Sequence, residues 1–197
     1  MKKTKTYLTV VLVAGLFSLT ASPETEAAAK TVTEQGLQNQ VRNGTFASFP
    51  KKGMAAGWSF WKTDDSQGKV RFEKNAGVKK SPAAVLFGGN ATLFCYVKIQ
   101  GGETIYARLK TKKIGEGDAV FTMRFQDAAH KKWFRESVNQ PIAFSKSDEW
   151  TVVELVVKAP AGAETAVPMY GIKNIDSPAS RFICDDVELY ILPEPAK

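Results

Sequence analysis

The chain has few of the residues from which most catalytic and metal centres are built. Its 197 residues include one histidine and two cysteines. The histidine, His130, lies in the polar stretch 127–132, which predicts an exposed turn, so a Ser-His-Asp or Cys-His arrangement has only a surface residue to use. Catalytic zinc sites take several His or Cys ligands, more than this chain supplies. The sequence also lacks a glycine-rich phosphate loop between a strand and a helix.

Apolar runs are short as well. The run 7–17 falls below the ~20 residues of a membrane-spanning helix. Three lysines in residues 2–5 precede it and alanines 27–29 follow it, which is the pattern of a secretory signal peptide. We expect residues 1–29 to be that peptide, with cleavage after Ala21, Ala27 or Ala29, and residues 30–197 to form a single domain. The protein is then secreted, periplasmic or on the cell surface, without membrane insertion; the alternative is an N-terminal anchor helix.

The net charge narrows the classes of possible binding partner only slightly. Lys and Arg number 27 against 20 Asp and Glu, a formal net charge of +7. The lysines occur in scattered pairs beside turn signals, which indicates solvated turns more than a binding stripe. We expect no nucleic-acid partner, since that would need a concentrated basic patch; an acidic polysaccharide remains a possible partner.

In an exported protein Cys95 and Cys184 could form a disulfide. The strand pattern, however, suggests that they lie on opposite faces, and two buried thiols are the alternative.

Alternating apolar and polar residues recur along the chain after residue 40. In 119–126, alanine, phenylalanine and methionine occupy one face, while Val, Thr, Arg and Gln occupy the other. Such alternation is typical of strands with one buried face. Gly, Pro and Asn clusters separate roughly ten such segments, and no long segment has helical periodicity. The sequence therefore predicts an all-β fold, an antiparallel sandwich; the further strand candidates are 41–46, 58–62, 69–73, 83–87, 93–99, 105–110, 152–157, 166–172, 181–184 and 187–191.

Aromatic residues suggest a binding surface. Trp61 and Tyr96 have the opposite parity to the apolar core positions of their strands, so their rings should face outward. Tyr106, Arg108, Arg124 and Gln126 are predicted to share one free sheet face with them, and Trp133 lies near a loop. Aromatic rings offer apolar platforms to sugar C–H faces, and Arg and Gln can hydrogen-bond hydroxyls. The alternatives are a second apolar face packed under loops and, for Trp133, packing at a sheet edge.

Acidic residues give no assignable catalytic pair. Asp64-Asp65 and Asp148-Glu149 lie in predicted turns, where acids usually cap and solvate. Asp185 shares the parity of the apolar Val187, so we expect its side chain to point inward, where a bare carboxylate is costly. A calcium ion would resolve this cost, because calcium prefers oxygen ligands. Backbone N–H groups from a loop would resolve it equally well.

The order of several short motifs resembles a known family. They are Asn43-Gly44-Thr45-Phe46, Gly57-Trp58-Ser59-Phe60-Trp61, Gly68-Lys69-Val70, Tyr96-Val97-Lys98-Ile99, Gly102-Glu103-Thr104, Leu109-Lys110-Thr111, Phe125-Gln126-Asp127, Trp150-Thr151-Val152-Val153, Ala159-Pro160-Ala161-Gly162 and Cys184-Asp185-Asp186-Val187-Glu188-Leu189. Each is weak alone, and their order and spacing carry the signal. The arrangement, over about residues 37–191, resembles the family 4/9-type carbohydrate-binding modules, which are galactose-binding-like jelly rolls.

The resemblance implies a jelly-roll β-sandwich and a secreted, non-catalytic module that binds a poly- or oligosaccharide on its concave sheet. It implies a monomer, and a structural calcium to which Asp185 contributes. Two departures weaken the match: Ala47 stands where many members have an acid, and Arg108 stands where many have a tryptophan. The Arg108 change could favour an acidic glycan. The rival hypotheses are a jelly-roll hydrolase or lyase and an envelope protein of structural or adhesive role.

Overall fold

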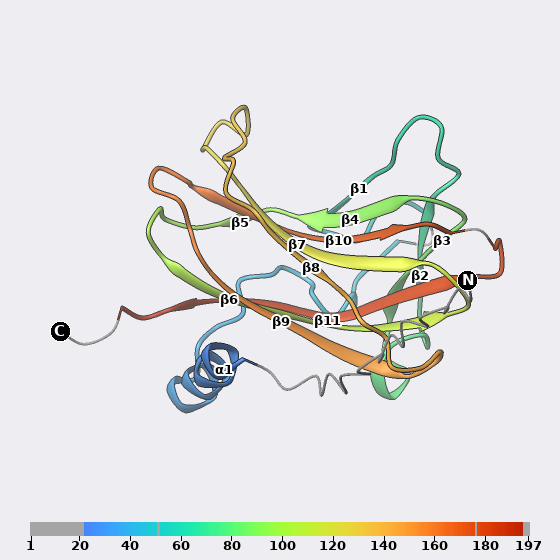
Figure 1. Cartoon of the computed structure of the whole chain (residues 1–197), viewed down its shortest axis with the longest axis horizontal. Helices are drawn as coiled ribbons and strands as arrows, with labels where there is room; N and C mark the ends of the chain where they lie inside the picture. The colour runs from blue at the N-terminus through green and yellow to red at the C-terminus, as the bar shows by residue number, and fades with distance from the viewer. Residues whose placement is uncertain (1–21, 51, 176, 195–197) are drawn as a thin grey trace, which may run out of the picture.

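Two antiparallel sheets stack face to face in the computed structural model, which describes residues 22–50, 52–175 and 177–194 (Figure 1). The six-stranded sheet contains β1 (Trp58–Trp61), β4 (Ala91–Cys95), β10 (Thr165–Lys173), β7 (Asp118–Gln126) and β8 (Val138–Pro141) in this order, with β5 (Val97–Lys98) also paired to β10. The five-stranded sheet contains β2 (Lys69–Glu73), β3 (Ala83–Phe87), β11 (Arg181–Leu192), β6 (Thr104–Ile114) and β9 (Trp150–Lys158). The predicted all-β antiparallel sandwich is confirmed.

The core lies between the sheets and follows the predicted alternation. On β7, Phe121, Met123 and Phe125 are buried and belong to the main apolar cluster. On β11, Phe182 and Leu189 reach the same cluster from the opposite sheet. Because the side chains of a strand alternate between its two faces, each inward set leaves a second set on the outer face of its sheet. These two outer faces are where binding groups can be displayed.

The N-terminal part of the domain departs from the strand prediction. Residues 41–46 form a turn instead of a strand, and Asn43 and Phe46 have φ angles of 56° and 52°. Phe46 is fully buried and its ring centroid lies 4.9 Å from that of Trp58. The indole N–H of Trp58 donates to the carbonyl oxygen of Asn43 at 3.1 Å. The apolar residues of this segment are thus core residues of a turn, which explains why alternation alone misassigned it.

One helix, α1 (Pro23–Gln35), packs on the outer face of the five-stranded sheet, where Figure 1 draws it beside β6, β9 and β11. Ser22 caps it by accepting from the N–H of Thr25 at 3.2 Å, and proline at the first helical position suits a helix start. The sequence offered no such helix, because it assigned residues 22–29 to the signal peptide. Cleavage after Ala27 or Ala29 would divide α1. The remainder of the predicted peptide, 1–21, lies outside the described residues.

Within the ranges that the structure describes, no helix is long and apolar enough to cross a membrane.

Candidate functional site

The outer face of the six-stranded sheet displays an aromatic surface. Trp61 ends β1 opposite Thr92 of β4, and its side chain is 56% exposed. Tyr96 follows the end of β4 and is 48% exposed. Tyr96 stands four positions after Thr92, or about 13 Å along an extended chain. The two rings therefore stand well apart on one face, which is the placement that the sequence predicted for Trp61 and Tyr96.

A tight turn after β7 brings more groups to the Tyr96 end of this face. One carboxylate oxygen of Asp127 accepts the N–H groups of Lys131 and Lys132, at 2.9 and 3.1 Å, and these bonds hold the pKa of Asp127 below its ordinary value. The turn carries His130, whose ring centroid lies 5.0 Å from that of Tyr96. Phe94 also meets Tyr96 edge-on, with 5.6 Å between centroids. Tyr96 is thus held in place by aromatic neighbours.

Trp133 and Arg124 form a second pair at the same end of the face. Trp133 pairs with Gln126 in an isolated bridge beside β7, and its side chain is 38% exposed. The guanidinium carbon of Arg124 lies 4.1 Å from the centroid of the Trp133 ring, within cation–π distance. The structure therefore brings Tyr96, Arg124 and Trp133 to one end of one face, with Trp61 at the other end.

Gln126 is buried, so its side chain is not accessible to a ligand. Only 3% of it is exposed, and its side-chain oxygen lies 3.1 Å from Nδ1 of His130. It therefore links β7 to the turn that carries His130. The sequence placed Gln126 on the outward face correctly, but alternation gives no signal for the turn that covers it.

Arg108 and Tyr106 do not belong to this surface, so the prediction that one face carries them together with Arg124 is wrong. Both lie on β6, in the five-stranded sheet. Their parity was assigned correctly, but parity does not say which of two sheets a strand joins. The signal that could have separated them is the acidic partner, since Glu188 and Glu154 lie opposite Arg108 in the register of the neighbouring strands.

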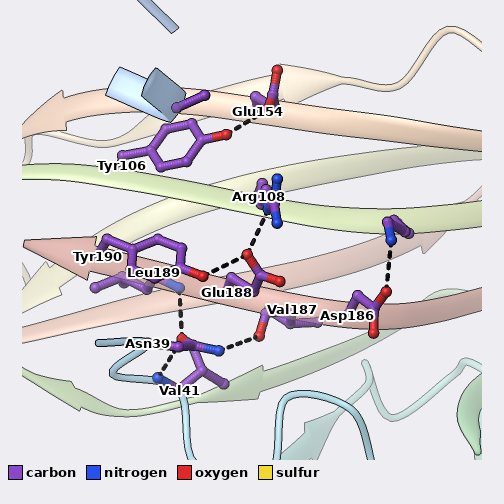
Figure 2. A network of polar contacts seen from close by, with 12 residues as sticks. Asn39, Val41, Tyr106, Arg108, Glu154, Asp186, Val187, Glu188, Leu189 and Tyr190 are labelled. Carbon is purple, nitrogen blue, oxygen red and sulfur yellow. Dashed lines mark hydrogen bonds and ion pairs between the residues drawn. The ribbon is translucent and has the colours of Figure 1, made fainter. Parts of the chain in front are cut away.

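Figure 2 shows the polar network that these residues form on the outer face of the five-stranded sheet. Arg108 is ion-paired with Glu188, with 2.5 Å between Nε and Oε2. The hydroxyl of Tyr190 donates to the same carboxylate at 2.8 Å, and the hydroxyl of Tyr106 donates to Glu154. Burial, and then the bond to Glu188, raise the pKa of Tyr190 to about 12. Both acids of this network, Glu188 and Glu154, are thus bound to side chains of the protein.

Asp185 is buried, but on the other side of its sheet from the one that the sequence predicted. The register of β11 against β6 shifts between Asp185 and Glu188, and Asp186 there has a φ angle of 47°. Asp185 pairs with Lys110, whereas its neighbour Cys184 belongs to the core cluster. The bulge thus reverses the parity, and the loop before β3 covers Asp185. An Asp-Asp pair tolerates this left-handed conformation better than most residues do, which is a weak signal in the sequence.

The carboxylate of Asp185 is satisfied by hydrogen-bond donors. Val78 N–H and the Ser81 hydroxyl donate to Oδ2 at 2.9 and 2.7 Å, and Asp186 N–H donates to Oδ1 at 2.8 Å. These are the loop donors that the sequence left as the alternative to calcium. N–H groups cannot coordinate a cation, so the contacts of this side chain fit a hydrogen-bonded carboxylate. Among the described residues, no group of three His, Cys, Asp or Glu side chains could hold a metal.

The two cysteines are buried thiols with no disulfide between them. Cys95 on β4 and Cys184 on β11 both belong to the core cluster, so they face inward from opposite sheets. Burial raises the pKa of Cys95 to about 12 and that of Cys184 well above its ordinary value. Both side chains act here as small apolar groups.

Two hollows on the described part of the molecule lie away from the aromatic surface. One hollow, of about 450 Å³, lies between the start of α1 and strands β8 and β9. The other, of about 660 Å³, lies beside the end of β11 and the loop before β6. Neither is lined by Trp61, Tyr96, Arg124 or Trp133.

Comparisons with known proteins identify the fold of this chain but assign it to no family. No protein-family model matches the chain, and no curated protein matches it. Among solved structures, the enzymatically active domain of bacteriophage CBA120 tailspike protein 4 is similar at a TM-score of 0.59 and 17% identity, over 78% of this chain and 21% of that one. The CBM22-1–GH10 modules of a Clostridium thermocellum xylanase, complexed with xylohexaose, give 0.56 and 16%, over 81% and 30%.

A separate module gives a comparison over its whole length. A family 16 carbohydrate-binding module is similar at a TM-score of 0.52 and 22% identity, over 77% of this chain and 99% of the module. This chain thus spans less than a third of each of the two larger proteins and almost all of the small one. At these identities the likeness shows the fold, which is the antiparallel jelly-roll sandwich that carbohydrate-binding modules have.

Proposed function

We propose that this protein is a non-catalytic carbohydrate-binding module that binds an extended poly- or oligosaccharide across the outer face of the six-stranded sheet. The observation that carries the proposal is the exposure of Trp61 and Tyr96 on one face, with Arg124 and Trp133 beside Tyr96. Large exposed aromatic residues gathered on one face of a soluble domain usually mark a binding surface. Sugar rings stack on such residues through their C–H faces.

The fold supports the same proposal, because 77% of this chain matches almost the whole of a separate carbohydrate-binding module. Membership in family 4 or 9, which the motif order suggested, stays a prediction, since the similar modules belong to families 16 and 22. Export through the N-terminal signal would bring the domain to extracellular glycans, and we expect it to act as a monomer. Glu154, Glu188 and Asp185 are each bound to other groups of the protein, which favours binding over a hydrolase or lyase.

The test is titration of a broad polysaccharide panel with the protein and three variants. We expect Trp61→Ala and Tyr96→Ala each to weaken binding about tenfold or more, since losing an aromatic anchor costs more than ~1 kcal/mol. Val152→Ala is the matched control, because Val152 is 52% exposed on the five-stranded sheet. Equal binding by all four proteins would contradict the proposed face.

Two further readouts distinguish the rival functions. New reducing ends or unsaturated sugars released from any polymer would indicate a glycan-cleaving enzyme. A stable complex with another protein, formed without sugar, would indicate an envelope protein of structural or adhesive role. The proposed module produces neither.

A further inference from the structure

Arg124 presents a guanidinium group that has no protein acceptor. It lies on β7 opposite Val167 of β10, on the outward side of the six-stranded sheet. Among the described residues its side chain makes no hydrogen bond and no ion pair, and its one cation–π contact is with the Trp133 ring, 4.1 Å from the guanidinium carbon to the ring centroid. By contrast, Arg108 and Arg71 are paired with Glu188 and Glu73. The donors of Arg124 are therefore available to a ligand.

The outward strand positions beside Arg124 hold no carboxylate, and the nearby Asp127 lies in the turn after β7, where it accepts from the N–H groups of Lys131 and Lys132. On β7 the outward positions run from Asp118 to Gln126, and the one carboxylate among them is Asp118, at the far end, where it accepts from Asn174 at 2.6 Å. Lys98 of β5 pairs with Thr165 of β10, which in turn pairs with Gln126 of β7, so this lysine lies on the same outer face two strands from Arg124. Two cations thus share the Tyr96 end of the face, with no acid between them in the strand register.

Stacking on Trp133 also fixes the orientation of the cation. A guanidinium held against an indole ring keeps its planar fork in one direction, so binding a ligand immobilises little additional freedom. Such a fork matches the two oxygens of a carboxylate. A neutral sugar hydroxyl would use only part of this donor set and would leave the positive charge without a partner.

We propose that the glycan bound on this face carries uronic acid residues, and that Arg124 binds a uronate carboxylate while Tyr96 contacts a neighbouring sugar ring. The inference rests on the proposed function, since it names the ligand class of that same surface. Lys98 adds charge attraction without the fork geometry. Trp133 acts as a positioning residue for the guanidinium.

The test compares each acidic polymer with the same polymer after its carboxyl groups have been reduced to alcohols. Polygalacturonate and alginate are the probes, and titrations use the full protein at two salt concentrations. We expect the wild type to bind at least one intact polymer about tenfold or more tighter than its carboxyl-reduced form. Arg124→Gln should remove most of that preference.

Two variants separate the effect of the bidentate guanidinium geometry from the effect of positive charge alone. Arg124→Lys keeps the charge and loses the bidentate geometry, so it should also lose most of the preference. Arg71→Gln makes the same change in net charge on β2 of the other sheet, and should retain the wild-type preference. Thermal unfolding of each variant shows whether it is folded.

Each contrary result has a distinct meaning. Tighter or equal binding of the carboxyl-reduced polymers, or of neutral glycans alone, overturns the uronate inference and keeps the proposed module. No binding to any neutral or acidic polymer overturns both. If dextran sulfate binds as tightly as the uronates, and Arg71→Gln weakens binding as much as Arg124→Gln does, the interaction is general charge attraction and the inference is wrong.

Discussion

Gly44 lies directly against Val187 at the bulge of β11. The N–H of Val187 donates to the carbonyl oxygen of Gly44 at 3.0 Å, and a Cβ atom built on Gly44 would lie 2.0 Å from the carbonyl oxygen of Val187. The two residues belong to the first and the last of the motifs on which the resemblance rests. Their contact closes the N-terminal turn onto the strand that carries Asp185.

This contact predicts that Gly44→Ala is destabilising, because the added methyl group overlaps backbone that cannot move without breaking the bulge. We expect a loss of about 1–3 kcal/mol in the free energy of unfolding, measured by chemical denaturation. Gly102→Ala is the control: its φ is 91° but its Cβ position is open, so it should cost only about 1 kcal/mol. A smaller loss at Gly44 than at Gly102 would contradict the close approach.

Burial raises the pKa of Asp185, against the effect of its three hydrogen-bond donors. The folded protein therefore holds this proton more tightly than the unfolded chain does. The group favours folding most below its ordinary pKa of 3.8, and this contribution is lost as pH rises through the higher folded pKa. Asp185→Asn removes the titration and leaves the shape nearly unchanged.

We therefore expect the stability of the wild type relative to Asp185→Asn to fall as pH rises from about 3 to 7. The measurement is a pair of denaturation curves at each pH. Asp127→Asn is a useful contrast, because its pKa is lowered and its difference curve should rise with pH instead. If the stability of the wild type relative to Asp185→Asn rose with pH, the hydrogen-bond donors would have a larger effect on the pKa of Asp185 than its burial has.

Calcium provides a separate test of Asp185. Because hydrogen-bond donors occupy this carboxylate, we expect the unfolding temperature to be the same in excess calcium and in chelator. If excess calcium raised the unfolding temperature, and Asp185→Asn abolished that increase, the structural calcium that the family resemblance implies would be established.

The packing of helix α1 against the sheet predicts that the folded domain needs residues 22–29 for its full stability. Ala28 packs against Tyr106 and Tyr190, whereas Ala27 is exposed. We expect a chain that starts at Lys30 to unfold about 2–8 °C below one that starts at Ser22, from a loss of roughly 1–2 kcal/mol of apolar burial. In the longer chain, Ala28→Asp should destabilise and Ala27→Asp should not. Equal stability of the two chains would show that α1 contributes little.

The buried thiols predict low reactivity. With a pKa of about 12 for Cys95 and a raised value for Cys184, almost no thiolate exists at pH 8. We expect no alkylation of the native protein by iodoacetamide, and two alkylated cysteines after unfolding without reductant. Two labels that require prior reduction would instead demonstrate a disulfide.

For most strands, though not for β8 or for the bulge of β11, the sequence was sufficient to place the strand and the side of it that faces the core. On β7, the spacing of Phe121, Met123 and Phe125 dictates both, because a strand with one buried face must alternate. The outward placement of Trp61, Tyr96 and Arg124 follows from the same rule. These features are local, so a single strand contains all the information that they need.

Other features depend on which strands become neighbours. Arg108 and Arg124 have equivalent parity, yet they lie on different sheets, and only the strand order gives one of them an acidic partner. The bulge that reverses Asp185 needs the register of β11 against β6, and the stacking of Arg124 needs the turn that returns Trp133 to β7. Alternation within one strand determines a face, whereas pairing between distant segments decides what that face meets.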